Sequence, residues 1–442
     1  MKKIDRRKFL KYSAYAGVGG AAFLYLPSFL LTGCGPADEP EVTPEQLNLL
    51  LGSHLDFMHP WLEDFEELHG VTPNLSEITT EDLRDRLSSA FAARSSPWDA
   101  VFTSAEVIAP MGAQGWLKDL TERVEGSHLA SGDKTLVELA AKSGHYFDQV
   151  VGVPIHIGCP IMLWNKKLME ERDLDPEAPS LWHEQRNSYD TFLEYAKQMT
   201  FERNGENYYG FIDNWAGDGV LWTYRAMVQM HGGDLITEDE QPLMNSEPCI
   251  EALEKMVDML HTHKCIDPAS MTYTWVFDCA PSFLGGRRGV FITWPFLIGV
   301  AEGEDSDIQG HVGFAPNFSV DTSAHADGSE FMSIPVFAEH EETAWKWIEM
   351  VTSYEYQKKM GETTGWFPIY EEVLTEPTVA ENNPAAPVVM QSYQYPANNY
   401  ITENFGRWVD ILVDQVHRAL NQQETPRDAL NEAARRIEEA LG

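Results

Sequence analysis

The stretch Leu47-Asn48-Leu49-Leu50-Leu51, followed by Gly52-Ser53-His54, decides the fold of this 442-residue chain. Four leucines in five residues, bounded by a glycine, predict a strand buried on both faces. The next apolar residues recur at helical spacing: Trp61, Leu62, Phe65 and Leu68. His69-Gly70 predicts the end of that helix. A strand followed at once by a helix predicts the first unit of an α/β fold.

The same alternation continues along the chain. Ala100–Thr103 predicts a second strand, and Gln149–Val153 predicts a third that Pro154 breaks. A helix near residue 250 can be capped by Asn245 or Ser246, and a last helix begins at Thr425-Pro426. Together these patterns predict α/β layers with a mostly parallel sheet.

Ligands of such sheets bind beyond the carboxyl ends of the strands. This places candidate binding residues in the loops after the first and second strands. The candidates are Ser53, His54, Asp56, Thr103, Ser104 and Glu106. For Asp56 and Glu106 a structural role is the alternative, because an acid near a helix N-terminus is stabilising.

The N-terminus carries an export pattern. A basic stretch around Arg6-Arg7 precedes 22 residues, 12–33, that contain no Asp, Glu, Lys, Arg or His. The paired arginines resemble a twin-arginine signal, and Leu31-Thr32-Gly33-Cys34 resembles the lipobox of bacterial lipoproteins, with Cys34 as the lipidated residue. We therefore expect a signal peptide over 1–33 and a tether over 34–45. An uncleaved membrane helix is the alternative, which Pro27 and three glycines weaken.

The charge of the chain excludes some ligand classes. There are 69 Asp and Glu against 32 Lys and Arg. The resulting net negative charge repels nucleic acid and anionic lipid, so we expect no nucleic-acid partner for the folded part. Solubility in the cell exterior explains the acidity, and a site for cations is the alternative.

Four cysteines follow Cys34, at 159, 249, 265 and 279. Cys249 and Cys265 flank the helix predicted near 250, and 16 residues of helix separate two backbones by roughly 24 Å. A disulfide needs Cα atoms within about 7 Å. We predict no bridge between these two and free thiols in the folded part, with a Cys265–Cys279 pairing left open.

Four segments resemble one protein family. They are Trp98–Thr103 with Gly115–Leu120, Tyr146–Lys167, Tyr209-Gly210-Phe211 with Gly232-Gly233-Asp234, and Ala344–Gln357 with Gly365-Trp366-Phe367-Pro368. In order and spacing they are similar to the family 1 bacterial extracellular solute-binding proteins, whose relatives bind maltose and other oligosaccharides. The pattern departs from the family at Trp164 and at His156, Gly158 and Cys159 of the expected hinge.

The resemblance implies an α/β, two-lobed periplasmic-binding-protein fold (type II-like) with hinge strands and an interlobe ligand cleft. The N-lobe would hold 46–156 plus 316–364, and the C-lobe 157–315 plus 365–442. The implied protein is not an enzyme, has no cofactor and no metal, and is a monomer. Its partners would be a small ligand, the membrane subunits of an ABC importer, and the membrane itself through the lipid anchor.

Sugars offer apolar faces and hydroxyl rims, so aromatic rings with nearby polar groups suit them. In segments where relatives carry binding residues, this chain has His156, Trp215, Asp218, Trp222, Trp294, Asn404, Arg407 and Trp408. Core or interlobe packing is the alternative for each tryptophan. The expected ligand is a mono- or oligosaccharide.

Three other functions stay open. The acidic charge would suit another solute such as a polyamine, and a secreted carbohydrate-active enzyme or a protein-interaction lipoprotein would also be exported. The zinc-protease motif His-Glu-x-x-His does not occur at either candidate place. After His183-Glu184 the second histidine position holds Asn187, and after His340-Glu341 it holds Ala344. Facing aromatic rings would favour a binding protein, whereas two carboxylates across a cleft would favour a glycosidase.

Overall fold

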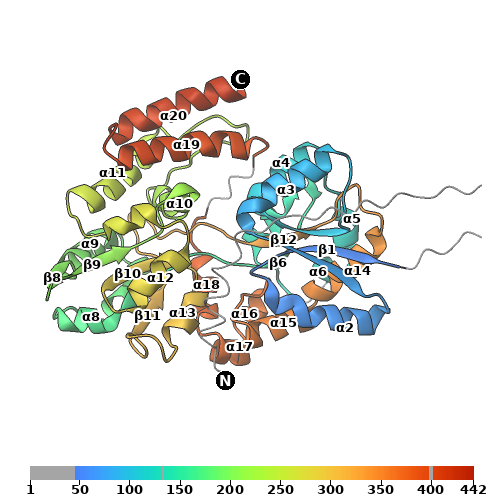
Figure 1. Cartoon of the computed structure of the whole chain (residues 1–442), viewed down its shortest axis with the longest axis horizontal. Coiled ribbons are helices and arrows are strands. Elements are labelled where there is room, and N and C mark those ends of the chain that lie inside the picture. Colours follow the sequence, from blue (N-terminus) through green and yellow to red (C-terminus); the bar gives the residue numbers. More distant parts are fainter. Residues whose placement is uncertain (1–44, 132–133, 398–401) are drawn as a thin grey trace, which may run out of the picture. The chain divides into compact units, whose positions relative to one another are not determined.

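The computed structural model describes residues 45–131, 134–397 and 402–442. Glu45–Gly442 forms one compact unit built around two five-stranded sheets (Figure 1). The predicted signal peptide, Cys34 and most of the tether lie outside the described residues. We call the parts around the first and second sheets the N-lobe and the C-lobe.

The first sheet has the order β2-β1-β3-β12-β6. Its strands are β1 Leu47–Gly52, β2 Pro73–Ile78, β3 Ala100–Ser104, β6 Val153–His156 and β12 Glu330–Ser333. Strand β1 pairs in parallel with β2 and β3, and β12 pairs antiparallel with β3 and β6. A small hairpin joins β4 His145–Tyr146 to β5 Gln149–Val150.

The second sheet has the order β11-β7-β10-β9-β8. Its strands are β7 Ile161–Asn165, β8 Phe201–Arg203, β9 Glu206–Ile212, β10 Arg288–Thr293 and β11 Val312–Ala315. Only the β9–β10 pair is parallel. The side chains of β7 alternate between the two faces of this sheet and pack into two hydrophobic cores. Met162 and Trp164 belong to one core, and Ile161 and Leu163 belong to the other.

Helices cover both sheets. In the N-lobe they are α2 His59–His69, α3 Thr80–Ala92, α4 Ala105–Ala113, α5 Thr121–Glu125, α6 His128–Ser131, α7 Glu138–Ser143, α14 Glu341–Thr352 and α15 Tyr354–Thr363. Three short helices follow: α16 Glu371–Leu374 and α17 Pro377–Asn382 pack on α15, and α18 Ala386–Ser392 packs on α16 and α17. We therefore propose that the chain changes lobe after α18 rather than at residue 365.

In the C-lobe the helices are α8 Lys166–Glu171, α9 Ser188–Gln198, α10 Val220–Met230, α11 Glu247–His261, α12 Val276–Leu284, α13 Phe296–Ala301, α19 Phe405–Leu420 and α20 Pro426–Leu441. Helices α19 and α20 lie side by side, and α11 packs on both (Figure 1). The 3₁₀-helices are η1 Asp56–Met58, η2 Ala178–Glu184, η3 Gly217–Gly219 and η4 Pro268–Thr272.

Most of the predicted elements are confirmed. Helix α2 ends at Gly70, which takes a left-handed conformation with φ of 68°. Helix α11 has Ser246 at its N-cap, and at the start of α20 the Thr425 side chain accepts a hydrogen bond from the Asp428 amide. The predicted strand at 100–103 is β3.

Two predictions about the sheets are wrong. Antiparallel pairs outnumber parallel ones, because strands that enter a sheet after the chain has crossed between the lobes run against their neighbours. Pro154 does not end a strand, since it lies inside β6 opposite Phe331. Proline, which has no amide hydrogen, is tolerated there because β6 is the edge strand of its sheet. On its outer side no further strand among the described residues is present to accept a hydrogen bond.

The chain crosses from the first sheet to the second at residues 157–160 and returns at 316–329. The two crossing segments are hydrogen-bonded, with the Gly328 amide donating to the Gly158 carbonyl at 2.7 Å. The Tyr393 hydroxyl, just after α18, lies 3.1 Å from the Gly158 amide and 2.6 Å from the Asp327 carboxylate. These contacts make one hydrogen-bonded junction between the lobes.

The cysteine prediction is confirmed for the described residues, where all four cysteines are free and buried. Cys249 lies at the beginning of α11 and Cys265 beyond its end. Burial raises the pKa of the Cys249 thiol to about 11 and that of Cys265 to about 12. Both thiols are therefore protonated and unreactive at neutral pH.

We predict that a thiol reagent such as Ellman's reagent modifies essentially no cysteine of the folded chain carrying Cys34→Ser. After unfolding in denaturant without reductant, the four buried thiols should all react. Absorbance of the released thiolate measures both values. Fewer than four reactive thiols after unfolding would reveal a disulfide and contradict the structure.

Candidate functional site between the two sheets

One edge of the first sheet collects polar side chains from separate strands. His54 follows β1, and Glu106 follows β3, which runs parallel to β1. Because β12 runs the opposite way, its first residue, Glu330, lies at the same edge, opposite Ser104 and His156. The sheet topology thus brings together residues more than 200 positions apart in the chain.

Glu330 is held between two histidines. One carboxylate oxygen lies 2.8 Å from His54 Nε2 and 2.6 Å from His156 Nε2. The side chains of His156 and Glu330 are 3% and 13% exposed, whereas that of His54 is 31% exposed. Burial alone would raise the pKa of Glu330, but the charges and hydrogen bonds of the two histidines lower it to about 2. Glu330 is therefore a carboxylate at neutral pH.

Aromatic packing fixes the two imidazoles. The Trp366 ring lies 4.6 Å from that of His156 and 5.7 Å from that of His54, measured between centroids. Phe102 contacts His54 edge to face at 5.4 Å. Gly52 leaves room for the His54 ring, since a Cβ there would lie 2.5 Å from its Cε1 atom. The histidines are thus held in place by packing as well as by Glu330.

Tryptophans gather at the facing edge of the second sheet. Trp294 follows β10 and lies 5.1 Å from the Trp222 ring of α10 and 6.2 Å from the Trp275 ring. It also packs on the crossing segments, because a Cβ at Gly328 would lie 2.2 Å from the indole. A cavity of about 20 Å³, lined by residues 156–158, 294–296 and 365–367, separates these rings from the N-lobe. That space has room for about one water molecule.

A buried carboxylate supports this aromatic group. Asp213, at the end of β9, accepts hydrogen bonds from the Trp215 indole at 3.0 Å and from the Thr223 hydroxyl. Burial raises the pKa of Asp213 to about 6, although these hydrogen bonds oppose the rise. Thr223 adjoins Trp222 in α10, so Asp213 fixes the helix that presents this ring.

One ion pair joins the lobes. Arg225 of α10 lies 3.1 Å from Glu106 of α4, and their side chains are 5% and 38% exposed. The Arg225 guanidinium also stands 5.6 Å over the Trp222 ring. At the ends of β9 and β10, two buried atoms, Asn214 Nδ2 and Thr293 Oγ1, have no hydrogen-bond partner among the residues that the structure describes. Such atoms at a strand end suit contacts with a ligand or with water.

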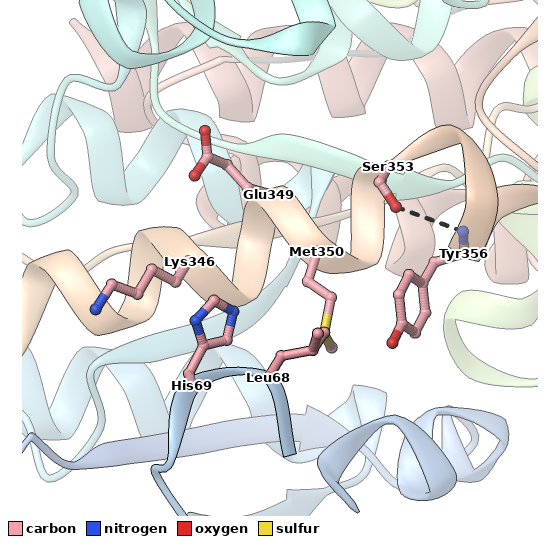
Figure 2. A pocket seen from close by; sticks show the side chains of 7 residues that line it. All are labelled: Leu68, His69, Lys346, Glu349, Met350, Ser353 and Tyr356. Carbon is pink, nitrogen blue, oxygen red and sulfur yellow. Dashed lines mark hydrogen bonds between the residues drawn. The ribbon is translucent and has the colours of Figure 1, made fainter. Parts of the chain in front are cut away.

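A second pocket, of about 300 Å³, has a different character. Leu68 and His69 of α2 line it together with Lys346, Glu349 and Met350 of α14, and with Ser353 and Tyr356. Figure 2 shows Met350 extending toward Leu68, whereas the Glu349 carboxylate points away from α2. Every lining residue comes from the N-lobe, and Lys346 also pairs with Glu45 at 2.9 Å. Its aromatic and charged side chains all belong to one lobe, so groups from the two lobes do not converge on this pocket as they do between the sheets.

The predicted site residues fall into two groups. His54, Ser104, Glu106, His156, Trp222 and Trp294 lie at the facing sheet edges. Asp218 is exposed but lies close enough to Glu106 for its charge to help raise the pKa of that carboxyl, after burial, which is the largest cause. Ser53, Asp56 and Arg407 are exposed, and Thr103 is buried with its hydroxyl 3.0 Å from Ser333.

Three further candidates make internal hydrogen bonds. The indoles of Trp215 and Trp408 are buried and donate to Asp213 and Thr402. The side chain of Asn404 donates to Glu240 at 2.6 Å. These three positions are occupied by structural contacts, so we leave them out of the site proposed below.

Sequence reasoning missed Glu330, Arg225, Trp275 and Trp366. Glu330 begins a strand, so a rule about carboxyl ends of strands passes over it. Arg225 lies inside a helix and Trp275 at a helix N-cap, where no local pattern marks a site. Trp366 was part of the Gly365–Pro368 segment that carried the family resemblance, which is the one signal that could have found it.

Comparison with known families decides the identity of the fold. The family model for the bacterial extracellular solute-binding proteins matches residues 61–388. The chain belongs to this family. Its members are binding proteins that act outside the cytoplasm, and nothing in this comparison indicates an enzyme. No helix among the described residues of this solute-binding protein is long and apolar enough to cross a membrane.

Characterised relatives are distant. The binding protein is 29% identical over 126 residues to an arabinooligosaccharide-binding protein of Halalkalibacterium halodurans, which covers 28% of this chain but only 24% of that protein. It is 21% identical over 397 residues to a probable amino-acid ABC transporter periplasmic-binding protein of Sinorhizobium fredii, which covers 88% and 86% of the two chains. The alignment with this chain thus spans about a quarter of the length of the arabinooligosaccharide-binding protein.

Solved structures share the two-lobed α/β fold. A maltose-bound protein of T. maritima superposes with a TM-score of 0.77 at 22% identity, over 89% of this chain and 99% of that one. A solute-binding protein of Thermotoga lettingae with bound α-D-tagatose gives 0.78 at 21% identity, over 90% and 100%. At these identities the likeness establishes the fold, which confirms the predicted fold class.

Asp213 yields a prediction about pH. Its pKa is raised from an ordinary value of 3.8 to about 6, so the folded state holds a proton that the unfolded state releases. Relative to Asp213→Asn, wild type should therefore lose on the order of 2–3 kcal/mol of stability as the pH rises from about 4 to about 7. Asp213→Asn cannot titrate and should lack this loss. Urea unfolding of both proteins at the two pH values measures it, and a pH-independent difference between them would contradict the assignment.

Proposed function

We propose that this solute-binding protein captures a saccharide or polyol between its lobes and delivers it to an ABC importer. The observation that carries the proposal is the group of rings at the crossing: Trp222, Trp275 and Trp294 of the C-lobe and Trp366 of the N-lobe. Flat rings stack on the apolar faces of sugars, and buried polar groups beside them bind hydroxyls. Both kinds of group meet here, from both lobes.

Charged and neutral polar groups around the rings fit the same ligand class. Glu106, Arg225 and Glu330 offer fixed acceptors and donors, and Asn214 and Thr293 offer two unused ones. The two similar structures were solved with maltose and tagatose bound, which supports a saccharide. The cavity of about 20 Å³ is too small for any sugar, so binding requires the lobes to open about the crossing segments.

An amino acid is the second candidate. Arg225 would suit the carboxylate of an amino acid, and Glu106 its ammonium group. Of the two relatives described above, the probable amino-acid ABC transporter periplasmic-binding protein also has the longer alignment with this chain. The polyamine alternative has less support, because Arg225 would repel a cation beside the rings. Any activity on the bound sugar lies outside this proposal.

We predict that Trp222→Ala and Trp294→Ala each weaken binding of the preferred sugar by 1–3 kcal/mol, or about 5- to 150-fold in Kd, through loss of one stacked ring. Calorimetric titration with maltose, arabino-oligosaccharide, tagatose and a set of amino acids measures this. Phe147→Ala is the matched control, because Phe147 is 79% exposed and does not line the cavity. Unchanged affinity in both tryptophan variants would mean that these rings only pack the interior.

Anchoring is the second part of the proposed function. We propose that Cys34, at the end of the lipobox-like segment Leu31–Cys34, carries the lipid that holds the protein at the membrane. Cys34→Ser should abolish incorporation of a labelled fatty acid and release the protein from the membrane fraction. Cys279→Ser is the matched control, because that thiol is buried in the C-lobe. Undiminished label in Cys34→Ser would exclude this anchor.

A further inference from the structure

Three side chains that commonly ligate metal ions converge at the edge of the first sheet. His54, His156 and Glu330 each offer one ligand atom, and these atoms all lie within 4.8 Å of one another. They come from three separate places in the chain, after β1, at the end of β6 and at the start of β12. Their convergence is therefore a product of the fold, unlike a local run of acidic residues.

The chemistry of the set selects a class of metal. Two imidazole nitrogens and one carboxylate suit late divalent first-row ions such as Zn²⁺ and Co²⁺, whereas Ca²⁺ and Mg²⁺ prefer oxygen ligands. With bonds of about 2.0–2.2 Å to a tetrahedral ion, ligand atoms stand about 3.3 Å apart. The present separations from Glu330 are 2.6 and 2.8 Å, so entry of an ion lengthens each of them by roughly 0.5–0.7 Å. The three ligand atoms, which lie within 4.8 Å of one another, must at the same time close around the ion. His54 is the most exposed of the three side chains, at 31%, so we assign most of this adjustment to it.

His156 has the second contact that is typical of a metal-ligating histidine. Its Nδ1 lies 3.2 Å from the Ile157 carbonyl oxygen, which can only accept a hydrogen bond. That contact orients the ring so that Nε2 points at the Glu330 carboxylate, 2.6 Å away. Trp366 and Phe102 hold the rings in this orientation.

We infer that His54, His156 and Glu330 form a binding site for one divalent transition-metal ion, with its remaining coordination positions open toward the space between the lobes. His156 and Trp366 line the interlobe cavity, so an ion here stands on the ligand side of the N-lobe. There it can coordinate an oxygen of the bound solute as an additional ligand. This departs from the sequence-based expectation of no metal.

The chain supplies its own control for this inference. His59 Nε2 lies 3.1 Å from Glu77, but both side chains are more than 40% exposed and no third ligand is grouped with them among the described residues. Any histidine–carboxylate pair on the surface can bind metal weakly. Only the three-ligand site should bind one equivalent tightly.

The test titrates the full chain, purified in detergent and freed of metal with EDTA, with Co²⁺ and then with Zn²⁺. Wild type should bind one equivalent of Co²⁺ with visible d–d absorption bands, and Zn²⁺ should displace it. His54→Ala, His156→Ala and Glu330→Gln should each weaken the Co²⁺ affinity at least about tenfold, whereas His59→Ala should not. Bands of equal strength in all variants, or none in wild type, would overturn the site.

Folding of the variants must be separated from metal binding. His156 is buried, so the decisive comparison is His54→Asn, which changes the most exposed ligand and leaves the core intact. Circular dichroism without metal confirms the fold of each variant. Because no sugar is present in these titrations, their failure would remove the metal site and leave the proposed saccharide function untouched.

Discussion

The hydrogen bond from the Gly328 amide to the Gly158 carbonyl is the contact on which the site depends. It joins the two segments that cross between the lobes, and Tyr393 and Asp327 extend it into a buried network. Trp294 packs directly against both glycines. A side chain at Gly328 would collide with the indole, so close backbone approach at the crossing is what lets a C-lobe ring face the N-lobe.

The topology of the first sheet explains why charged groups accumulate opposite these rings. Parallel strands β1 and β3 end at the interlobe edge, and the antiparallel β12 starts there. Three strand termini thus supply His54, Glu106 and Glu330 to one surface. Because Arg225 reaches Glu106 from the other lobe, the same surface also carries a contact that the opening of the lobes must break. In the proposed capture of a sugar, contacts between the lobes are replaced by contacts with the ligand at the same groups.

Much of the fold follows from local patterns in the sequence. The leucine run of β1, the Gly70 end of α2 and the Thr425 cap of α20 are set by nearby residues, and each was predictable. Strand direction was not, because it depends on how often the chain crosses between the lobes. Pro154 shows the same limit, since its place in β6 depends on which strand lies at the sheet edge.

The site divides in the same way. Trp222, Trp294, His54 and Glu106 were predictable from strand ends and family segments. Trp215 and Trp408 have the same residue type and lie in similar segments, yet they are buried in the C-lobe core. Only tertiary packing separates a ring that faces a cleft from one that fills a core. The partners Arg225 and Glu330 depend wholly on long-range pairing, which no local pattern contains.

A crystal structure with the sugar that binds most tightly tests the central claim most directly. The account predicts density for the sugar between the two sheets, with a ring face against Trp294 or Trp222 and hydroxyls within hydrogen-bond distance of Glu106, Arg225 or Glu330. Density for the sugar only outside this space, for example in the N-lobe pocket between Leu68 and Tyr356, would contradict it.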